Sequence, residues 1–418
     1  MGQEIGSVAV VGLGKLGLPL AAAFAGAGLR VVGVDRDPAL VAALNAGEIP
    51  SSEPGIRERL ASAAHGLETS SDPAAGADCD ATVFMLPTPP DPRTGRYDAG
   101  VLCKAAEGRA RAVARHGTGG DHLFIVGCTV MPGAIDGDVR AALLAGLGDP
   151  PPELNLAYSP EFVALGTVLR DYETPDMILI GAPSQDIGWR TAALYRRIAR
   201  NDPPVEIVSI LEAEIAKMAL NGYLCQKISF GNFLSQYCAA RGAGNPHAIA
   251  RAIGRDRRIG QAYLAPGMPY GGPCLSRDVA AFRAMSTEVG LDAPHLEATE
   301  RLNDRQADLV ARRALMMGDG VIAIFGVSFK PGSPVCDESP SIALAERLLA
   351  SGRKVLLWDP DPETRKRMPP DRVQGAEWRD APEDCANADC AVIAHPGRRL
   401  RERVSEIFPE QRRVDPWG

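Results

Sequence analysis

The sequence predicts an α/β protein in which two doubly wound units flank a helical middle segment. In the first and last thirds of the chain, short apolar runs alternate with helix-like stretches, as in parallel sheets covered by helices on both faces. Between them, apolar residues recur every three to four positions over residues 204–240, which is the period of a long helix. The length of 418 residues suits two or three domains.

Bulk composition limits the class of protein. Hydrophobic residues make up 45% of the chain and charged residues 23%, and the net charge of -7 argues against a nucleic-acid partner. No apolar run approaches the roughly 20 residues of a membrane span, and the N-terminus does not resemble a secretory signal. The nine cysteines lack paired spacing, and the six histidines form no metal-binding pattern. We therefore expect a cytoplasmic protein with reduced thiols, no membrane partner and no metal.

A glycine-rich turn follows the first apolar run, Ser7–Val11. Its sequence is Gly12-Leu13-Gly14-Lys15-Leu16-Gly17, and an alanine-rich helical stretch comes next. Gly12 is expected to make the turn, Gly14 to let the backbone approach a pyrophosphate, and Gly17 to allow close packing of helix on strand. The next apolar run ends at Asp35. This order of strand, turn, helix, strand and acid predicts a dinucleotide-binding unit.

Asp35 and Arg36 bear on which dinucleotide is bound. Asp35 lies about 20 residues beyond the turn, where its carboxylate can bond a ribose 2′-hydroxyl and would repel a 2′-phosphate. The Arg36 cation weakens this preference for a 2′-hydroxyl, because it would attract a 2′-phosphate. We predict NAD rather than NADP, and the predicted cofactor residues in this part of the chain are Gly12, Leu13, Gly14, Gly17, Asp35 and Arg36.

Polar side chains follow three further predicted strands. Thr88, Thr129 and Glu161 come just after the apolar runs at 81–86, 122–126 and 154–158. Ligands of parallel sheets lie beyond the carboxyl ends of the strands, so these side chains are candidates to face cofactor or substrate. For the two threonines, the alternative is that each hydroxyl bonds the backbone of its turn.

Lys217 and Asn221 are four residues apart in the predicted long helix and therefore share a face. A lysine beside an amide can polarise a substrate oxygen and shuttle its proton, provided that the lysine is partly desolvated. The alternative is a solvated lysine, although the neighbouring residues are apolar. A helix of this length would span about 50 Å, which suits a domain connector and a dimer interface.

The segment from Tyr270 to Asp278 carries the most distinctive chemistry. Its sequence is Tyr270-Gly271-Gly272-Pro273-Cys274-Leu275-Ser276-Arg277-Asp278, and a helix is predicted over 278–289. A thiol near a helix start is placed to ionise, and a thiolate attacks carbonyl carbons. The alternative is a buried structural cysteine. The cations at 255–258 suit either anion capture or an exposed surface patch.

Taken in order, these segments resemble the nucleotide-sugar 6-dehydrogenases, the UDP-glucose/GDP-mannose dehydrogenase family. The resemblance covers most of the chain, and its pieces are Gly12 to Gly17, Ser159-Pro160-Glu161-Phe162, residues 212–217 with Asn221, residues 227–230, the Gly271-Gly272-x-Cys274-x-x-x-Asp278 segment and residues 325–331. It implies an NAD-binding Rossmann-type domain at 1–203 and a central helical dimerisation domain at 204–300. A C-terminal Rossmann-like domain at 301–418 would hold the nucleotide sugar.

The resemblance also implies a reaction. A primary alcohol at sugar C6 would be oxidised by four electrons to a carboxylate, with NAD as acceptor and with a thiohemiacetal and a thioester on Cys274. UDP-glucose is the default substrate, in nucleotide-sugar or polysaccharide biosynthesis. The implied assembly is a homodimer or a dimer of dimers.

Roles carry over where residues match the family's motifs. Lys217 and Asn221 would stabilise the oxyanion with Asp278 nearby, and Thr129 and Glu161 would place the catalytic water. Arg258 would reach the sugar site of a neighbouring subunit. The implied substrate-binding residues are Glu161, Phe162, Lys217, Asn221, Arg258, Tyr270, Gly271, Gly272 and Lys330.

Two departures from the family pattern favour one of two rival functions, a non-catalytic homologue. Leu165 stands where many members have a second glutamate, and Asp337 stands where most have an arginine that faces cofactor phosphate. The change at Asp337 is expected to weaken dinucleotide binding or to change its geometry. One rival is a two-electron hydroxyacid dehydrogenase, which needs neither Cys274 nor a third domain. The other is a non-catalytic nucleotide-binding homologue.

Overall fold

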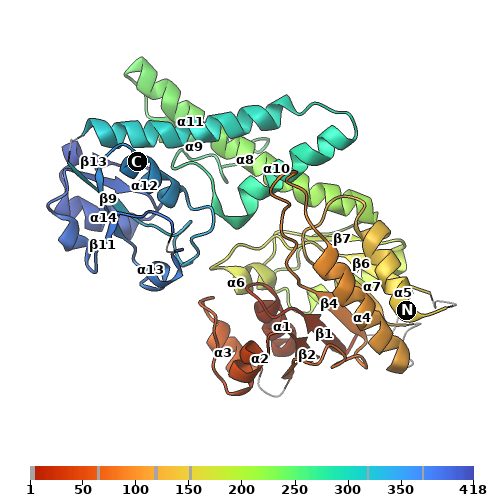
Figure 1. Cartoon of the computed structure of the whole chain (residues 1–418). Helices are drawn as coiled ribbons and strands as arrows, with labels where there is room; N and C mark the ends of the chain where they lie inside the picture. The colour runs from red at the N-terminus through yellow and green to blue at the C-terminus, as the bar shows by residue number, and fades with distance from the viewer. Residues whose placement is uncertain (1–4, 64–65, 117–120, 150–152, 318–319, 370) are drawn as a thin grey trace. The chain divides into compact units, whose positions relative to one another are not determined.

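The computed structural model describes residues 5–63, 66–116, 121–149, 153–317, 320–369 and 371–418. The chain divides into two compact units, Met1–Met218 and Ala219–Gly418, and the division falls inside the long helix α8 (Ile210–Arg241). Each unit contains a largely parallel sheet between helices (Figure 1). The α/β fold class predicted from the sequence is therefore confirmed, whereas the domain limits at 203/204 and 300/301 stay predictions.

The first unit is built on an eight-stranded sheet in the order β3-β2-β1-β4-β5-β6-β7-β8. Neighbouring strands pair in parallel, except for the antiparallel pair of β6 and β7. The chain order reverses between β1 and β4, which is where sheets of this kind bind ligands. The strands are β1 (Ser7–Val11), β2 (Arg30–Val34), β3 (Leu67–Ser70), β4 (Ala81–Phe84), β5 (Leu123–Val126), β6 (Asn155–Tyr158), β7 (Ile178–Gly181) and β8 (Val205–Val208).

Helices cover both faces of this sheet because its strands are apolar on both faces. In β1, Val8 and Val10 join one buried cluster and Ala9 joins another on the opposite face. Helices α1, α3, α6 and α7 contribute to the first cluster, while α4, the π-helical turn η1 and α5 contribute to a third cluster, which Val11 on the Ala9 side of β1 also packs against. The helices are α1 (Gly17–Gly26), α2 (Pro38–Asn45), α3 (Ile56–Ser62), α4 (Gly100–His116), η1 (Ile135–Val139), α5 (Arg140–Leu147), α6 (Val168–Glu173) and α7 (Gln185–Arg196).

The predicted long helix is present, but the prediction that it starts at Pro204 is wrong. Residues Val205–Val208 form strand β8, which pairs with β7 at the edge of the first sheet. Three of these four residues are β-branched, and such side chains favour a pleated surface. Ile207 also packs where Gly188 of α7 leaves room for it. Helix α8 therefore begins only at Ile210.

The helical part of the second unit contains the rest of α8 together with α9 (Pro246–Gly254), α10 (Gly272–Glu288) and α11 (Pro294–Met316). Helix α10 starts before its predicted start at Asp278, because Gly271 precedes it in an extended conformation and Pro273 fits its first turn. Cys274 therefore lies in the first turn of a helix. In the described parts of the chain, every helix is too short or too polar to span a membrane.

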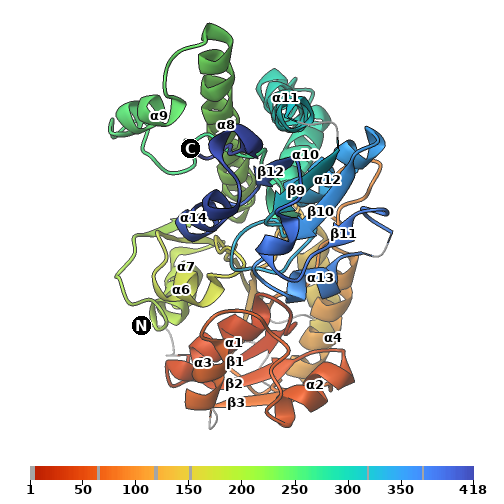
Figure 2. The same ribbon diagram turned by 90° about the vertical axis from the view of Figure 1, so that its left-hand side faces the viewer.

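A second, five-stranded parallel sheet completes the second unit, in the order β11-β10-β9-β12-β13. Helices α11 and α12 cover one face and α14 covers the other (Figure 2). This sheet matches the predicted second doubly wound unit. Its elements are β9 (Val321–Phe325), α12 (Pro340–Ala350), β10 (Lys354–Trp358), α13 (Glu363–Arg367), β11 (Glu377–Trp378), η2 (Pro382–Cys385), β12 (Cys390–Ile393), α14 (Arg398–Ile407), η3 (Glu410–Arg412) and β13 (Arg413–Val414).

Candidate active site

The three glycines of the first turn differ in what a side chain at each position would contact. Gly12 has a φ of 98°, and a Cβ there would lie 2.4 Å from the carbonyl oxygen of Met85. A Cβ on Gly17 would lie 1.8 Å from the carbonyl oxygen of Gly12. At Gly14, by contrast, the position of a Cβ has no described atom within 4 Å. Two glycines therefore serve the fold, and the third leaves an opening in front of the turn.

Asp35 holds this turn from the end of β2. Its carboxylate accepts hydrogen bonds from the backbone N–H of Leu13 at 2.7 Å and of Asp37 at 3.0 Å. Arg36 beside it is exposed. Helix α1 begins at Leu16 without a side-chain cap, so no side chain of the cap residue accepts from its first N–H groups. These residues fit NAD: the helix start suits a pyrophosphate, and the second lone pairs of the Asp35 carboxylate suit a ribose hydroxyl.

Thr88 and Thr129 meet across the ends of β4 and β5. The Thr88 hydroxyl donates to the carbonyl oxygen of Thr129 at 2.6 Å, so it bonds the backbone of the neighbouring loop and not, as the alternative had it, the backbone of its own turn. The bond joins the two loops that follow the sheet's reversal point. Thr129 itself is half-buried at that edge.

Lys217 is held against the segment that follows β6. Its Nζ donates to the backbone carbonyl of Glu161 at 2.7 Å and lies 4.8 Å from the centroid of the Phe162 ring. Only 8% of Lys217 is exposed, so the alternative of a solvated lysine is wrong. The sequence-predicted residues Glu161, Phe162 and Lys217 thus form one cluster in the first unit.

The Glu161 carboxyl group is an unusual acid. Burial raises its pKa to about 8, although the Lys217 cation and a hydrogen bond from Tyr195 act in the opposite direction. The Tyr195 hydroxyl donates to the carboxyl at 3.4 Å from helix α7. A carboxyl group that titrates near neutral pH can exchange protons with a reacting group, which is the behaviour needed in general acid–base catalysis.

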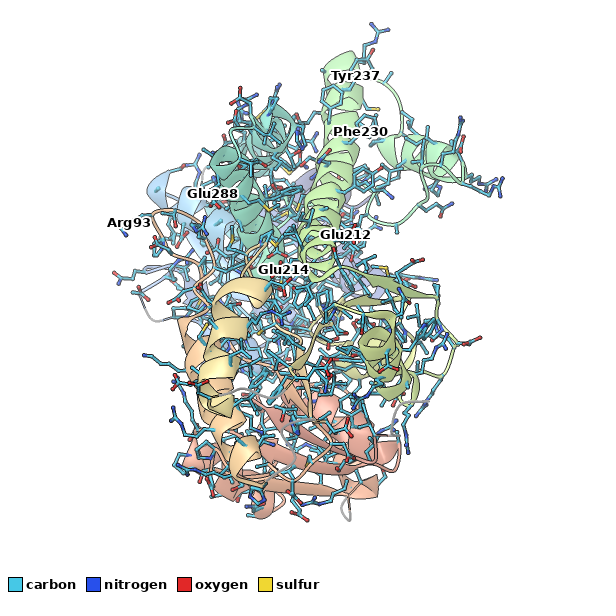
Figure 3. The ribbon with its side chains drawn as sticks, turned by 90° about the vertical axis from the view of Figure 1, so that its right-hand side faces the viewer. Arg93, Glu212, Glu214, Phe230, Tyr237 and Glu288 are labelled. Carbon is cyan, nitrogen blue, oxygen red and sulfur yellow. The ribbon has the colours of Figure 1, made fainter. Side chains whose placement is uncertain are left out.

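Glu214, three residues before Lys217, is a buried residue that the sequence did not single out as functional. Its carboxylate accepts from the backbone N–H of Gly133 at 2.6 Å and of Ile135 at 2.9 Å. It is fully buried near the start of α8, where Figure 3 labels it, three residues before Lys217. Glu214 therefore ties the helix that carries Lys217 to the loop that carries Thr129. The signal in the sequence that could have identified Glu214 is its position three residues before Lys217, on the same face of the predicted helix.

In the second unit, Asn221 and Asp278 form a buried pair. The Asn221 amide nitrogen donates to the Asp278 carboxylate, and the two residues are 8% and 1% exposed. Asp278 lies one helical turn after Cys274 on α10. Cys274 is exposed in the first turn of α10, where backbone N–H groups favour a negative charge, so it is not the buried structural cysteine of the alternative.

The glycine pair before Cys274 is required by close packing. A Cβ on Gly271 would lie 2.3 Å from the carbonyl oxygen of Glu338, and one on Gly272 would lie 2.4 Å from the Phe329 ring. The Glu338 carbonyl also accepts from the Gly272 N–H at 2.9 Å. Because Lys330 follows Phe329, the predicted substrate lysine and the cysteine segment are neighbours within the second unit.

Two other predicted substrate residues differ in their surroundings. Tyr270 is buried with its ring among Cys225, Val279 and Leu296, and burial raises its pKa. Arg258 is exposed after α9 and pairs with Asp256 at 2.7 Å. The structure does not bring Arg258 to the other predicted residues of the second unit. Among the described residues, no cluster of three or more His, Cys, Asp or Glu side chains could hold a metal ion.

These features define a class of protein. A dinucleotide-binding unit, a buried lysine beside a carboxyl group and an exposed helix-terminal cysteine, followed by a second α/β unit, are the features of an NAD-linked dehydrogenase.

The chain belongs to the UDP-glucose/GDP-mannose dehydrogenase family. The family's NAD-binding domain matches residues 6–199, its central domain residues 211–305 and its UDP-binding domain residues 323–415. As a member, the protein is an NAD-dependent oxidoreductase acting on nucleotide sugars, and both rival functions are disfavoured.

Individual relatives agree with this assignment. UDP-glucose 6-dehydrogenase of Haloferax volcanii is 34% identical over 399 residues, covering 93% of this chain and 90% of the relative. UDP-glucose 6-dehydrogenase of Pseudomonas aeruginosa is 32% identical and covers 84% of this chain and 78% of the relative. The solved structure of a UDP-glucose dehydrogenase from Pyrobaculum islandicum is 29% identical, with a TM-score of 0.90 and coverage of 100% of this chain and 95% of that one.

Proposed function

We propose that this protein oxidises the C6 primary alcohol of a nucleotide sugar to a carboxylate through a thioester on Cys274. What supports the proposal most directly is the position of Cys274: an exposed thiol in the first turn of α10, one turn before the buried Asp278–Asn221 pair. A thiol at a helix start is favoured as thiolate, which is the form that attacks an aldehyde.

The oxidation would remove two hydrides, each accepted by a separate NAD molecule. The first leaves the alcohol carbon as its hydroxyl loses a proton, which gives the aldehyde. The Cys274 sulfur then adds to the aldehyde carbon and the oxygen gains a proton, and the resulting thiohemiacetal becomes a thioester when its carbon loses the second hydride and its hydroxyl loses a proton. Water then adds, the carbon–sulfur bond breaks, and carboxylate and thiol are released.

Residue roles follow from chemistry and position. Lys217 and Asn221 would stabilise the oxyanion at the reacting carbon, with Asp278 orienting the Asn221 amide. Glu161 and Thr129 would place and deprotonate the water, since the Glu161 carboxyl titrates near neutral pH. Gly12, Leu13, Gly14, Gly17 and Asp35 would hold NAD, with Arg36 and Thr88 at the edges of that site.

The proposed substrate is UDP-glucose. The support is the match of residues 323–415 to a UDP-binding domain and the names of the relatives. Lys330, Tyr270, Gly271 and Gly272 would contact the sugar nucleotide, because the cysteine segment packs against Phe329 beside Lys330. Glu161 and Phe162 would line the sugar end.

The test is a panel of UDP-, GDP- and TDP-sugars incubated with NAD, with NADH and product mass read together. Two NADH per carboxylate formed from UDP-glucose is the expected result. One NADH per substrate would indicate a two-electron dehydrogenase, and saturable binding without turnover across the panel would indicate a non-catalytic homologue. Cys274→Ser should keep substrate affinity and abolish carboxylate formation.

We further propose that the protein is a cytoplasmic homodimer, alone or as a dimer of dimers, with α8 at the interface. Tyr223, Phe230, Phe233 and Tyr237 are each between 42% and 58% exposed on this helix. Their spacing of seven, three and four residues places them in one stripe, as in helices that pair side by side. A second copy of the chain would bury this stripe and bring the exposed Arg258 near a neighbouring sugar site. The cysteine pattern supports a reducing compartment.

A further inference from the structure

We propose that three amide side chains, Asn232, Asn303 and Gln306, are positioning residues that fix the segment leading into Cys274. We call these three residues the amide clamp. The proposal rests on the proposed function of Cys274 as nucleophile, but the geometry of the clamp does not depend on it.

Asn303 of α11 pairs with Tyr270 through both edges of its amide. The Tyr270 N–H donates to Asn303 Oδ1 at 2.8 Å, and Asn303 Nδ2 donates to the Tyr270 carbonyl at 3.0 Å. A single side chain thus replaces the neighbouring strand that would hold an extended segment. Tyr270 is four residues before Cys274, so this pairing fixes the backbone at the entrance to the helix.

Asn232 and Gln306 fix the residues before Tyr270. The Gly267 N–H donates to Asn232 Oδ1 at 2.8 Å, and Asn232 Nδ2 donates to the Met268 carbonyl at 3.2 Å. Gln306 Nε2 donates to the Gly267 carbonyl at 2.7 Å. Asn232 is fully buried and Gln306 is 4% exposed, so these bonds form away from water.

Residues 264–271 form no helix or strand, and their buried backbone groups therefore need side-chain partners. The opposite side of the segment is closed by packing: a Cβ on Gly267 would lie within 2.0 Å of the Trp417 ring, and Gly271 abuts Glu338. The clamp supplies the side-chain hydrogen bonds, and these neighbours fill the space against the glycines.

The consequence for catalysis follows from the short path between clamp and sulfur. Loss of a clamp residue frees backbone within a few residues of Cys274, and a displacement of about 1 Å of a reacting group can cost roughly a hundredfold in rate. The clamp residues should therefore act on turnover through Cys274 and leave the dinucleotide unit untouched.

The experiment compares Asn303→Ala and Asn303→Asp with Arg305→Ala, which changes an exposed residue of the same helix. Asn303→Asp keeps the acceptor for the Tyr270 N–H and loses the donor to its carbonyl. We expect kcat to fall about tenfold to a hundredfold in Asn303→Ala and less in Asn303→Asp, with KM for NAD unchanged. Arg305→Ala should behave as the parent.

Two readouts do not require activity. Hydrogen exchange by mass spectrometry should quicken in the peptide over residues 264–272 of Asn303→Ala, while the α11 peptide keeps its parent rate. The rate at which iodoacetamide modifies Cys274, followed by peptide mass, should change in the same order as kcat.

The outcomes separate the proposals. Parent-like exchange at 264–272 and parent-like alkylation in Asn303→Ala would overturn the clamp, whatever the turnover. Faster exchange together with a protein that shows no turnover in any form would keep the clamp and overturn the proposed function. If Asn303→Ala fails to fold, hydrogen exchange over residues 264–272 is measured on Asn303→Asp instead. Faster exchange than in the parent supports the clamp, and parent-like exchange overturns it.

Discussion

At the residue scale, Glu161 makes a specific prediction about pH and stability. Because burial raises its folded-state pKa to about 8 from an ordinary value of 4.5, the folded protein holds a proton that the unfolded chain releases. The folded state should therefore lose stability as pH rises from about 5 to 8, since protons are bound more tightly by the native form. Glu161→Gln cannot ionise, so its unfolding midpoint should vary less over this range. Glu206→Gln, at an exposed residue of β8, should keep the parent's pH dependence.

The same residue predicts a pH–rate profile. If Glu161 deprotonates the water that releases the thioester, that step should speed up as pH rises through about 8. Single-turnover release of carboxylate, measured from pH 6 to 9, checks this expectation. A flat profile would remove the general-base role from Glu161.

Glu214 makes a prediction of stability. Its removal would leave the N–H groups of Gly133 and Ile135 without this acceptor, and for the buried Ile135 N–H the loss costs about 1–3 kcal/mol in comparable cases. Glu214→Ala should therefore lower the urea midpoint clearly, and Glu214→Gln should do so less. Glu212→Ala is the control, because Glu212 is a glutamate of the same helix that is exposed. Its carboxylate accepts from the Ser209 N–H at the surface and not in the interior. Equal midpoints for Glu214→Ala and Glu212→Ala would contradict the anchoring role.

Residues of the site differ in how far sequence alone could identify them. Gly12, Gly17 and Asp35 are predictable because their spacing within one strand–turn–helix encodes their contacts. Glu214 and Asn303 are not, because their hydrogen-bond partners are 81 and 33 residues away along the chain. Only the folded backbone brings such partners together.

At the scale of elements, we expect Gly14 of the first turn to affect NAD binding and Gly17 of the same turn to affect stability. Gly14→Ala places a methyl group where no described atom lies within 4 Å, so stability should stay within about 0.5 kcal/mol of the parent. The same methyl group would block the approach of a pyrophosphate, and the Kd for NAD should rise at least about tenfold, or 1.4 kcal/mol. Calorimetric titration and thermal unfolding measure the two effects. An unchanged Kd would contradict the assignment of this turn to the cofactor.

Gly17→Ala is the matched comparison for that variant. Its methyl group would lie 1.8 Å from the Gly12 carbonyl oxygen, so α1 would have to shift away from β1. This variant should unfold at a clearly lower temperature than Gly14→Ala, because overpacking typically costs about 1–3 kcal/mol and occasionally more.

Most elements were predictable because the sheets are buried on both faces. Continuous apolar runs such as 7–11 and 321–325 coincide with β1 and β9. Strand β8 was missed because four residues at the edge of a sheet carry too little periodicity to stand out against the helical pattern that follows. The start of α10 was placed too late because glycine and proline usually indicate a loop, whereas here Gly271 and Pro273 form a helix start.

At the scale of the whole molecule, the stripe on α8 predicts how copies of the chain associate. Phe230 and Tyr237 project from the far half of the helix (Figure 3). Phe230→Lys and Tyr237→Lys together should convert the proposed dimer into a monomer, because charges would replace the apolar surface proposed to pair. Trp189→Lys is the control, since Trp189 is 50% exposed on α7 of the first unit. Sedimentation or light scattering gives the mass, and a parent-like mass for the double variant would contradict this interface.

The second α/β unit repeats the loop-and-acid arrangement of the first. Gly326 follows β9 with a φ of 91°, as Gly12 follows β1, and the Asp359 carboxylate at the end of β10 accepts from the Val327 N–H, as Asp35 accepts from Leu13. Asp359 also accepts from the Ser328 N–H and hydroxyl, the Asp361 N–H and the Thr364 hydroxyl.

A carboxylate offers about four lone-pair positions, and these five hydrogen bonds occupy all of them. Asp359 therefore has no capacity left for a ribose, whereas Asp35 accepts only two bonds among the described residues. The stoichiometry of NAD binding should accordingly be one molecule per chain, even though the polypeptide contains two folds of the kind that bind it.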